Sequence, residues 1–251
     1  MRIALLTDIH GNLEALDACL EEVASVGADR IVCLGDVVGY GADPEACVDR
    51  IAALCDAGAV CIRGNHDAAV ETGGDDMSAA AATAIAWTAA RLSAGAKAFL
   101  GRLPIAHREG EVLCVHASAD VPDRWTYVLT ADEAALSLAA TDAWLVLSGH
   151  THVPALFSVL TRIAGTTGKV GSFAPPANKP VPLSRVRRHH AVIGSVGQPR
   201  DGDPRACWGI LDLAAGDIVW RRTPYDIDAA ARKIREAGLP RRLAERLSVG
   251  R

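Results

Sequence analysis

The first sixty residues alternate short apolar runs with segments of helical periodicity. Residues 3–6, 31–34 and 59–62 are apolar runs of strand length. After the first run, apolar side chains recur every three or four positions, at Leu13, Leu16, Leu20 and Val23, as in an amphipathic helix. After the second run, Asp43-Pro44 is a typical helix start. The resulting order of strand, helix, strand, helix, strand predicts parallel strands joined by crossover helices.

Cap and turn residues place the elements in the middle of the chain. Residues 78–100 are an alanine-rich region that predicts helix packed beside the sheet. Glu109-Gly110 separates two short β-like runs and indicates a hairpin. Thr130 and Glu133 form a capping box before a short helix. Residues 144–147 are a further buried strand.

The last third of the chain contains a long excursion, a hairpin and terminal helices. Residues 164–182 are rich in glycine and proline and predict an irregular excursion. Residues 207–213 and 218–220 flank a turn and predict a late hairpin. Residues 226–250 predict one or two helices, with a break near Gly238-Leu239-Pro240. No internal repeat or long linker is present, so we expect a single domain over residues 1–251.

Composition narrows the class of protein. The chain has 251 residues, 50% of them hydrophobic and 22% charged, with a net charge of -4. These values exclude a disordered or low-complexity chain and argue against a large duplex-DNA footprint or a stable nucleic-acid complex. No apolar run of about 18 residues occurs, so no membrane span is predicted. The seven cysteines are irregularly spaced, with no secretory signal before them, and we expect reduced core cysteines in a cytoplasmic protein.

Metal-ligand residue types follow five predicted strands. The five blocks are Asp8-Ile9-His10, Gly35-Asp36, Gly64-Asn65-His66-Asp67, His116, and Gly149-His150-Thr151-His152. In an α/β sheet, ligands bind at the carboxyl ends of strands, so the blocks can converge on one site. Each block alone is more often a turn or a structural histidine, but five of the eight histidines fall within them. Asp, His and Asn are ligands for Mn²⁺, Fe or Zn²⁺.

The ordered set of blocks resembles the calcineurin-like metallophosphoesterase family. The blocks span residues 8–152, and residues 194–200 resemble the closing loop of a bacterial subgroup. That subgroup contains small phosphodiesterases and symmetrical diadenosine tetraphosphate hydrolases. The resemblance implies an α/β fold, a four-layer α/β/β/α sandwich with a two-metal centre between the sheets.

The resemblance also implies a role for each block. Asp8, His10 and His152 would hold one metal, Asn65, His116 and His150 a second, and Asp36 would bridge them. The two divalent ions, with Mn favoured over Fe, Zn, Co or Ni, would activate a hydroxide and clamp the phosphate. His66 would be the general acid. Asp67 would either orient His66 or be a cap or turn residue, and the sequence leaves both alternatives open.

Some positions separate this chain from protein phosphatases of the superfamily. The protein phosphatases carry an arginine that binds the substrate phosphate shortly after the Gly-Asp block, and this chain has Tyr40 at that position. That favours the phosphodiesterase-like branch. Arg63, Tyr40 and Arg200 are substrate-binding candidates, the arginines through phosphate and Tyr40 by stacking on a base, as Trp125 could also do. Each has a structural alternative, as a strand-end ion pair, a solvated loop charge or a partly buried core residue.

We therefore expect a metal-dependent phosphodiesterase or dinucleotide polyphosphatase with a small phosphorylated substrate. The alternatives are a phosphomonoesterase and, less favoured, a non-catalytic metal-binding scaffold. The basic stretch at residues 185–190 is either a phosphate or nucleic-acid contact or, as we favour, a solvated face. A homo-oligomer is possible in principle, with residues 78–100 or the late hairpin as its interface.

Overall fold

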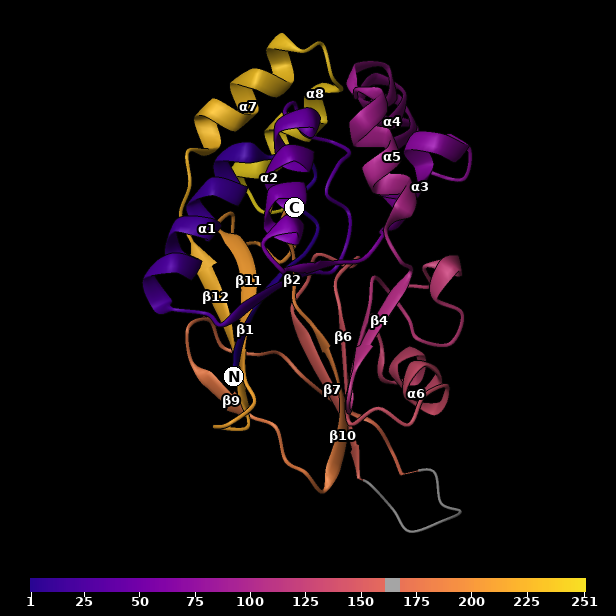
Figure 1. Cartoon of the computed structure of the whole chain (residues 1–251), viewed down its shortest axis with the longest axis vertical. Coiled ribbons are helices and arrows are strands. Elements are labelled where there is room, and N and C mark those ends of the chain that lie inside the picture. The colour runs from indigo at the N-terminus through magenta and orange to yellow at the C-terminus, as the bar shows by residue number, and fades with distance from the viewer. Residues whose placement is uncertain (161–167) are drawn as a thin grey trace.

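Two six-stranded sheets lie face to face in the computed structural model, which describes residues 1–160 and 168–251 (Figure 1). The first sheet has the order β3 (Val60–Cys61), β2 (Arg30–Cys33), β1 (Arg2–Leu6), β11 (Ala206–Asp212), β12 (Asp217–Thr223) and β9 (Pro180–Pro182). The second has the order β4 (Ala106–Glu109), β5 (Val112–Val115), β6 (Leu145–Ser148), β10 (Arg187–Val192), β7 (Ala155–Leu160) and β8 (Gly171–Phe173). β1, β2 and β3 are parallel, as predicted.

The alternation of side chains along β1 creates two separate cores. Ile3 and Leu5 face the second sheet and pack with β6 and β11 residues such as Leu147 and Leu211. Ala4 and Leu6 face the other way and pack under α1 (Leu13–Val26) and α2 (Pro44–Asp56). Because successive side chains of a strand point to opposite faces, β1 contributes to both cores. On the outer face of the second sheet lies α6 (Ala131–Ala139), which completes the expected four layers.

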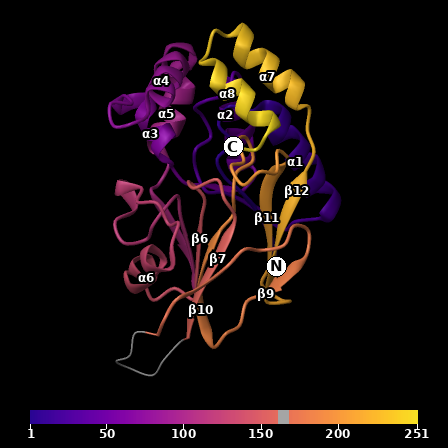
Figure 2. The ribbon, with the colours of Figure 1, turned by 180° about the vertical axis from the view of Figure 1, so that it is seen from behind.

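Further helices gather at one end of the sandwich, above the carboxyl ends of β1 and β2, as both views show (Figure 1, Figure 2). They are α3 (Asn65–Thr72), α4 (Ala79–Arg91), α5 (Ala94–Arg102), α7 (Ile227–Glu236) and α8 (Arg241–Glu245), with short 3-10 turns at Pro122–Arg124 and Arg246–Ser248. Small residues of α4 pack against α7 and α8, where Leu243 is fully buried. This helical group forms a roof beside the strand ends.

Most of the elements predicted from the sequence are confirmed, and the structure divides one predicted helical region into two helices. The hairpin at Gly110 joins β4 to β5, the capping box starts α6, and the terminal helix breaks after Glu236. The helical region 78–100 is two helices, because Ser93 ends the first segment and caps α5 by accepting a hydrogen bond from Ala96 N–H. Part of the predicted excursion, residues 164–167, lies outside the described residues. The rest contributes β8 and β9.

Within the described part of the chain, every helix is too short or too polar to cross a lipid bilayer.

The roof should depend on Leu243. Leu243→Ala should lower the free energy of unfolding by about 2–5 kcal/mol, because it leaves a cavity where α8 packs on α4. Leu136→Ala, at a helical leucine that is 63% exposed, should change it by no more than about 0.5 kcal/mol. Urea unfolding of both variants measures the difference. Equal losses would contradict the packing described here.

Candidate metal centre

The five polar blocks all lie where their strands end, and both sheets contribute. Asp8 and His10 follow β1, Asp36 follows β2, and Asn65 begins α3 just after β3. His116 follows β5, and His150 and His152 follow β6. The carboxyl ends of these parallel strands meet at one edge of the sandwich. All seven predicted ligand residues therefore lie in one place.

One group of possible ligands consists of Asp8, His10 and His152, all buried. His152 Nε2 lies 3.2 Å from Asp8 Oδ1 and 3.1 Å from His10 Nε2. His10 Nε2 lies 3.6 Å from the same Asp8 oxygen. Three donor atoms thus face a common point, as ligands of a single ion do.

Asp36 lies between this group and a second one. Its Oδ2 atom is 3.6 Å from His10 Nε2 on one side and 3.3 Å from His116 Nε2 on the other. Asp36, His116 and His150 form the second group, and Asn65 Oδ1 lies 3.2 Å from His116 Nε2. A carboxylate with one oxygen facing both groups is placed to bridge two cations.

Backbone carbonyls fix which nitrogen each histidine presents. Nδ1 of His10 is 3.0 Å from the Val38 oxygen, Nδ1 of His116 is 2.8 Å from the Leu34 oxygen, and Nδ1 of His152 is 2.6 Å from the Gln198 oxygen. In each neutral ring Nδ1–H donates to the carbonyl, which leaves the Nε2 lone pair directed at the centre. Metal-binding histidines are commonly oriented in this way.

Two buried atoms at the centre lack a hydrogen-bond partner within the described residues. They are Asp8 Oδ1 and His150 Nε2. A buried polar atom without a partner costs free energy, and a cation would satisfy both atoms. The donor set of carboxylate, imidazole and amide oxygens suits divalent transition metals. The residues present therefore fit a dinuclear metal site.

Burial and mutual attraction shift the ionisation of the ligands. Burial acts to raise the pKa of Asp8 and Asp36, but the surrounding histidines outweigh it and hold both values well below the usual range. Burial lowers the pKa of His150 to about 3 and that of His152 to about 4. Burial also disfavours charge on His116, but Asp36 outweighs it and raises the pKa of His116 to about 10. A metal ion would take the place of the His116 proton.

His66 lies beside the two groups, with its ring 4.8 Å from that of His10. Its Nδ1 atom is buried without a partner among the described residues, and burial lowers its pKa to about 3. Gly39 makes room for it, because a Cβ there would overlap Nδ1 of His66. Tyr40 covers the other side, with its ring 4.5 Å from the rings of both His10 and His66.

Asp67 organises the backbone under the ligands. Its two carboxylate oxygens accept hydrogen bonds from the N–H groups of Asp36, Val37, Val38 and Gly64, at 2.8–3.2 Å. Burial and the nearby Asp36 raise the pKa of Asp67 to about 7, although the hydrogen bonds from backbone N–H groups act to lower it. Asp67 had two possible roles, to orient His66 or to cap a turn. These contacts with backbone N–H groups are those of a cap and turn residue.

The segment at residues 194–200 closes the centre from the other side. Ser195 Oγ donates to the Asp8 carbonyl at 2.9 Å and accepts from Gln198 N–H. Gln198 in turn supplies the carbonyl that orients His152. The predicted closing loop thus contacts the centre through the Ser195 hydroxyl and the Gln198 carbonyl, and Arg200 extends from its end.

A cleft of about 990 Å³ opens from the centre toward the roof. Asn65, His66 and His150 lie at its base. One wall is aromatic. The Tyr127 ring stacks on the His150 ring, with 4.0 Å between the ring centres. Trp125 also lines the cleft, and its buried Nε1 atom has no hydrogen-bond partner among the described residues. Arg200 also lines the cleft, and its guanidinium lies 5.6 Å from the Tyr40 ring centre.

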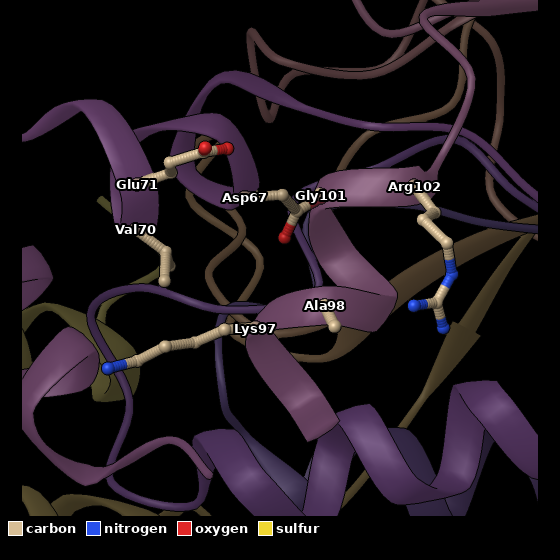
Figure 3. Close-up of a pocket in the computed structure, with 7 residues that line it drawn as sticks. All are labelled: Asp67, Val70, Glu71, Lys97, Ala98, Gly101 and Arg102. Atoms are coloured by element: carbon tan, nitrogen blue, oxygen red, sulfur yellow. The ribbon is translucent and has the colours of Figure 1, made fainter. Parts of the chain in front are cut away.

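Arg63, the third residue predicted to bind substrate, does not reach the cleft. Its Nη1 atom donates to the Gly101 carbonyl of α5 at 3.3 Å. Gly101 borders a separate pocket of about 450 Å³ between α3 and α5 (Figure 3). In Figure 3, Lys97 and Arg102 extend away from each other, so they do not converge on one anion. This pocket contains none of the seven ligand residues.

The basic stretch at residues 185–190 is part of the second sheet and its edge. Arg188 donates to the carbonyls of Ala143 and Leu138 at 2.9 and 2.7 Å, and Arg185 pairs with the exposed Glu111. His190 is fully buried and lies 2.8 Å from Ser148 Oγ. The stretch has structural partners and does not line the cleft.

Several residues that line the cleft were missed by the sequence reasoning, and three of them contribute to its charge or its aromatic surface. Tyr127, Arg242 and Arg246 line the cleft from a loop and from the terminal helix. Arg242 and Arg246 stand four positions apart, a helical spacing that puts them on one face. That spacing was the available signal, but the sequence did not reveal which face meets the cleft.

Comparisons with known proteins identify a family, a similar sequence and similar structures. A family model described as calcineurin-like phosphoesterase matches residues 1–154. An uncharacterized protein of Methanocaldococcus jannaschii is 35% identical, over 99% of this chain and 98% of its own length. The crystal structure of a metallophosphoesterase from Sphaerobacter thermophilus is 35% identical, covers 100% of this chain and 99% of that one, and has a TM-score of 0.86. A hypothetical protein from Pyrococcus horikoshii, 18% identical, shares the fold with a TM-score of 0.78 over 100% and 98% of the two chains.

The metal-free protein should lose stability as the pH falls from 6.5 to 5. The folded pKa values of His66, His150 and His152 lie near 3–4, below the unfolded value of about 6.5. In this window the unfolded chain binds more protons than the folded protein. The free energy of unfolding therefore decreases as the pH is lowered, by on the order of 1 kcal/mol per histidine for each pH unit. Thermal unfolding in chelator measures this, and a midpoint that is flat or rises toward pH 5 would refute it.

Proposed function

Because this chain belongs to the calcineurin-like phosphoesterase family, we propose that it hydrolyses phosphodiesters or dinucleotide polyphosphates with the help of two divalent metal ions. The observation that carries this proposal is the position of Asp36 Oδ2 between His10 and His116. A single carboxylate oxygen facing two ligand groups favours a two-metal centre over a single structural ion. Mn²⁺ is the metal we favour.

Seven residues would hold the ions in this proposal. Asp8, His10 and His152 would hold one, Asn65, His116 and His150 the other, with Asp36 shared. Two ions bound there supply Lewis acidity toward phosphate oxygens and a nucleophile drawn from water at neutral pH. The buried carboxylates offset part of the cations' mutual repulsion.

His66 is the proposed general acid, which protonates the leaving oxygen. Its ring is at the base of the cleft, and Nδ1 has no protein partner among the described residues to compete for a proton. The pKa of about 3 in the free protein will rise when an anionic phosphate binds, since nearby negative charge favours the protonated ring. Asp67 acts in this proposal through the backbone turn that presents Asp36.

The walls of the cleft support a diester with an aromatic group. Tyr40 occupies the position after the Gly-Asp block, so a neutral ring would lie beside the reacting phosphate, and Arg200, near that ring, would bind an anionic group of the substrate. Trp125 and Tyr127 offer flat surfaces to a base. We also propose that residues 1–251 form one domain. We further propose that the protein acts in the cytoplasm, since its seven cysteines are free.

The bridging role of Asp36 predicts a loss of metal. Asp36→Asn should lower bound metal from about two ions per chain to one or fewer, and should lower turnover at least about a hundredfold, because the neutral amide cannot offset two cations. Elemental analysis after dialysis against Mn²⁺ measures occupancy. Asp142→Asn, at a side chain that is 84% exposed, is the matched control. Full occupancy with full activity in the Asp36 variant would refute the mechanism.

The choice of substrate class predicts a preference between two chromogenic esters. With Mn²⁺, bis(p-nitrophenyl) phosphate should be hydrolysed faster than p-nitrophenyl phosphate, and chelator should abolish both reactions. His66→Gln should lower turnover about 10²–10⁴-fold, the range for loss of a general acid. A preference for the monoester would favour a phosphomonoesterase instead. Metal binding without turnover of any phosphoester would favour a scaffold.

A further inference from the structure

Two arginines of the terminal helix face the cleft from the roof. Arg242 and Arg246 both line it, and Arg246 N–H donates to the Arg242 carbonyl in the continuous turn from α8 into the 3-10 segment. They therefore lie on the same face, one turn apart. Like charges at this spacing destabilise a helix, so the pair is not explained by the stability of α8.

The neighbouring face of the same helix shows the usual arrangement. Arg241 Nε lies 2.6 Å from Glu245 Oε1, four positions along, and Arg241 is exposed. This pair is of the kind that stabilises a helix. The helix thus carries a paired arginine toward solvent, and toward the cleft two arginines that have no aspartate or glutamate partner in the described part of the chain.

Arg200 completes a cationic group on this wall. Within residues 1–160 and 168–251, none of Arg200, Arg242 and Arg246 forms an ion pair with an aspartate or glutamate side chain. Arg200 Nη2 donates to Gln198 Oε1 at 2.9 Å, and its buried Nε has no acceptor there. Arg246 Nε donates to the Arg251 backbone oxygen, which leaves its two terminal nitrogens for another acceptor.

The charges are close enough to affect one another. Burial and the nearby Arg200 lower the pKa of Arg246 to about 10. The acidic residues that line the cleft, Asp75, Asp76 and Asp123, are exposed at its rim. The cluster of positive charge is therefore left for a ligand to neutralise.

A single diester phosphate does not account for this cluster. It carries one negative charge, and the metal centre with His66 already serves the phosphate that reacts. Arginine is the side chain best suited to bind a phosphate through two parallel hydrogen bonds. Arg200, Arg242 and Arg246 line the same 990 Å³ cleft and are placed for a further anionic group.

We propose that Arg242 and Arg246, with Arg200, bind a second, non-reacting phosphate group of the substrate. This inference rests on the proposed function and narrows it to esters that carry at least two phosphate groups. The aromatic wall formed by Trp125 and Tyr127 faces the same cleft, so a nucleotide with an additional phosphate matches both walls.

Binding of matched nucleotides tests the second phosphate. The full chain loaded with Mn²⁺ is titrated by calorimetry with AMP, ADP and adenosine 3′,5′-bisphosphate, and chromatography confirms that each ligand stays intact. At least one of the two ligands with an extra phosphate should bind about tenfold or more tightly than AMP, since a charge-assisted hydrogen bond is worth about that factor. Equal affinity for all three ligands would overturn the proposal.

Substitutions assign the preference to the roof. Arg246→Gln and Arg242→Gln should each reduce the preference over AMP to about threefold or less, whereas Arg241→Gln, on the outer face, should retain it. Arg242 is exposed, so its variant tests the proposal even where Arg246→Gln unfolds. A preference that survives in both cleft variants would overturn the proposal.

The two proposals fail in different ways. Absence of metal-dependent diester hydrolysis would refute the proposed function, while the nucleotide preference still reports on the arginines. Normal diester hydrolysis with no preference for the extra phosphate would refute this inference alone.

Discussion

The burial of two carboxylates at one point is the constraint on which the rest of the structure depends. Asp8 and Asp36 are fully buried at the junction of the two sheets. An isolated buried carboxylate is very unfavourable, so the fold surrounds each with donors. Asp8 accepts from Thr7 Oγ1 and His150 N–H, and Asp36 accepts from His66 N–H. The remaining oxygens face histidine nitrogens, and this is the arrangement that a cation would complete.

The same convergence forces an unusual backbone. Asp8, His10, Asp36, His150 and His152 all have φ between 52° and 65°, a left-handed conformation that is unfavourable for residues with a Cβ. Two neighbouring positions also have to be glycine. A Cβ on Gly64 would overlap Asp36, and a Cβ on Gly149 would overlap Asp8. The four N–H groups held by Asp67 keep one of these turns in place. The fold therefore accepts an unfavourable backbone conformation at five of the candidate ligands, and this cost supports a functional role for them.

The sequence predicted that the seven candidate ligands lie close together, because each of them follows a strand end. Apolar runs identify the strands, and the polar residues that follow must gather where parallel strands end, so no long-range contact had to be known. The roof was different. Which face of α8 meets the cleft depends on how Leu243 packs among alanines of α4 and α7, and Arg63 turns away because α5 offers it the Gly101 carbonyl. Such contacts join residues far apart in the chain and leave little trace in local spacing.

The division of the site between two parts of the chain explains how one chemistry can serve a particular substrate. The family model ends at residue 154, and all seven proposed ligands precede that point. Yet the carbonyl that orients His152, the hydroxyl that holds the Asp8 backbone and three of the arginines that line the cleft all come from residues 195–246. The sheets fix the reacting centre, whereas the later segments fix its outer wall. Changes in α7 and α8 can therefore alter which phosphate esters fit without moving the ligands, because all seven proposed ligands lie outside these two helices.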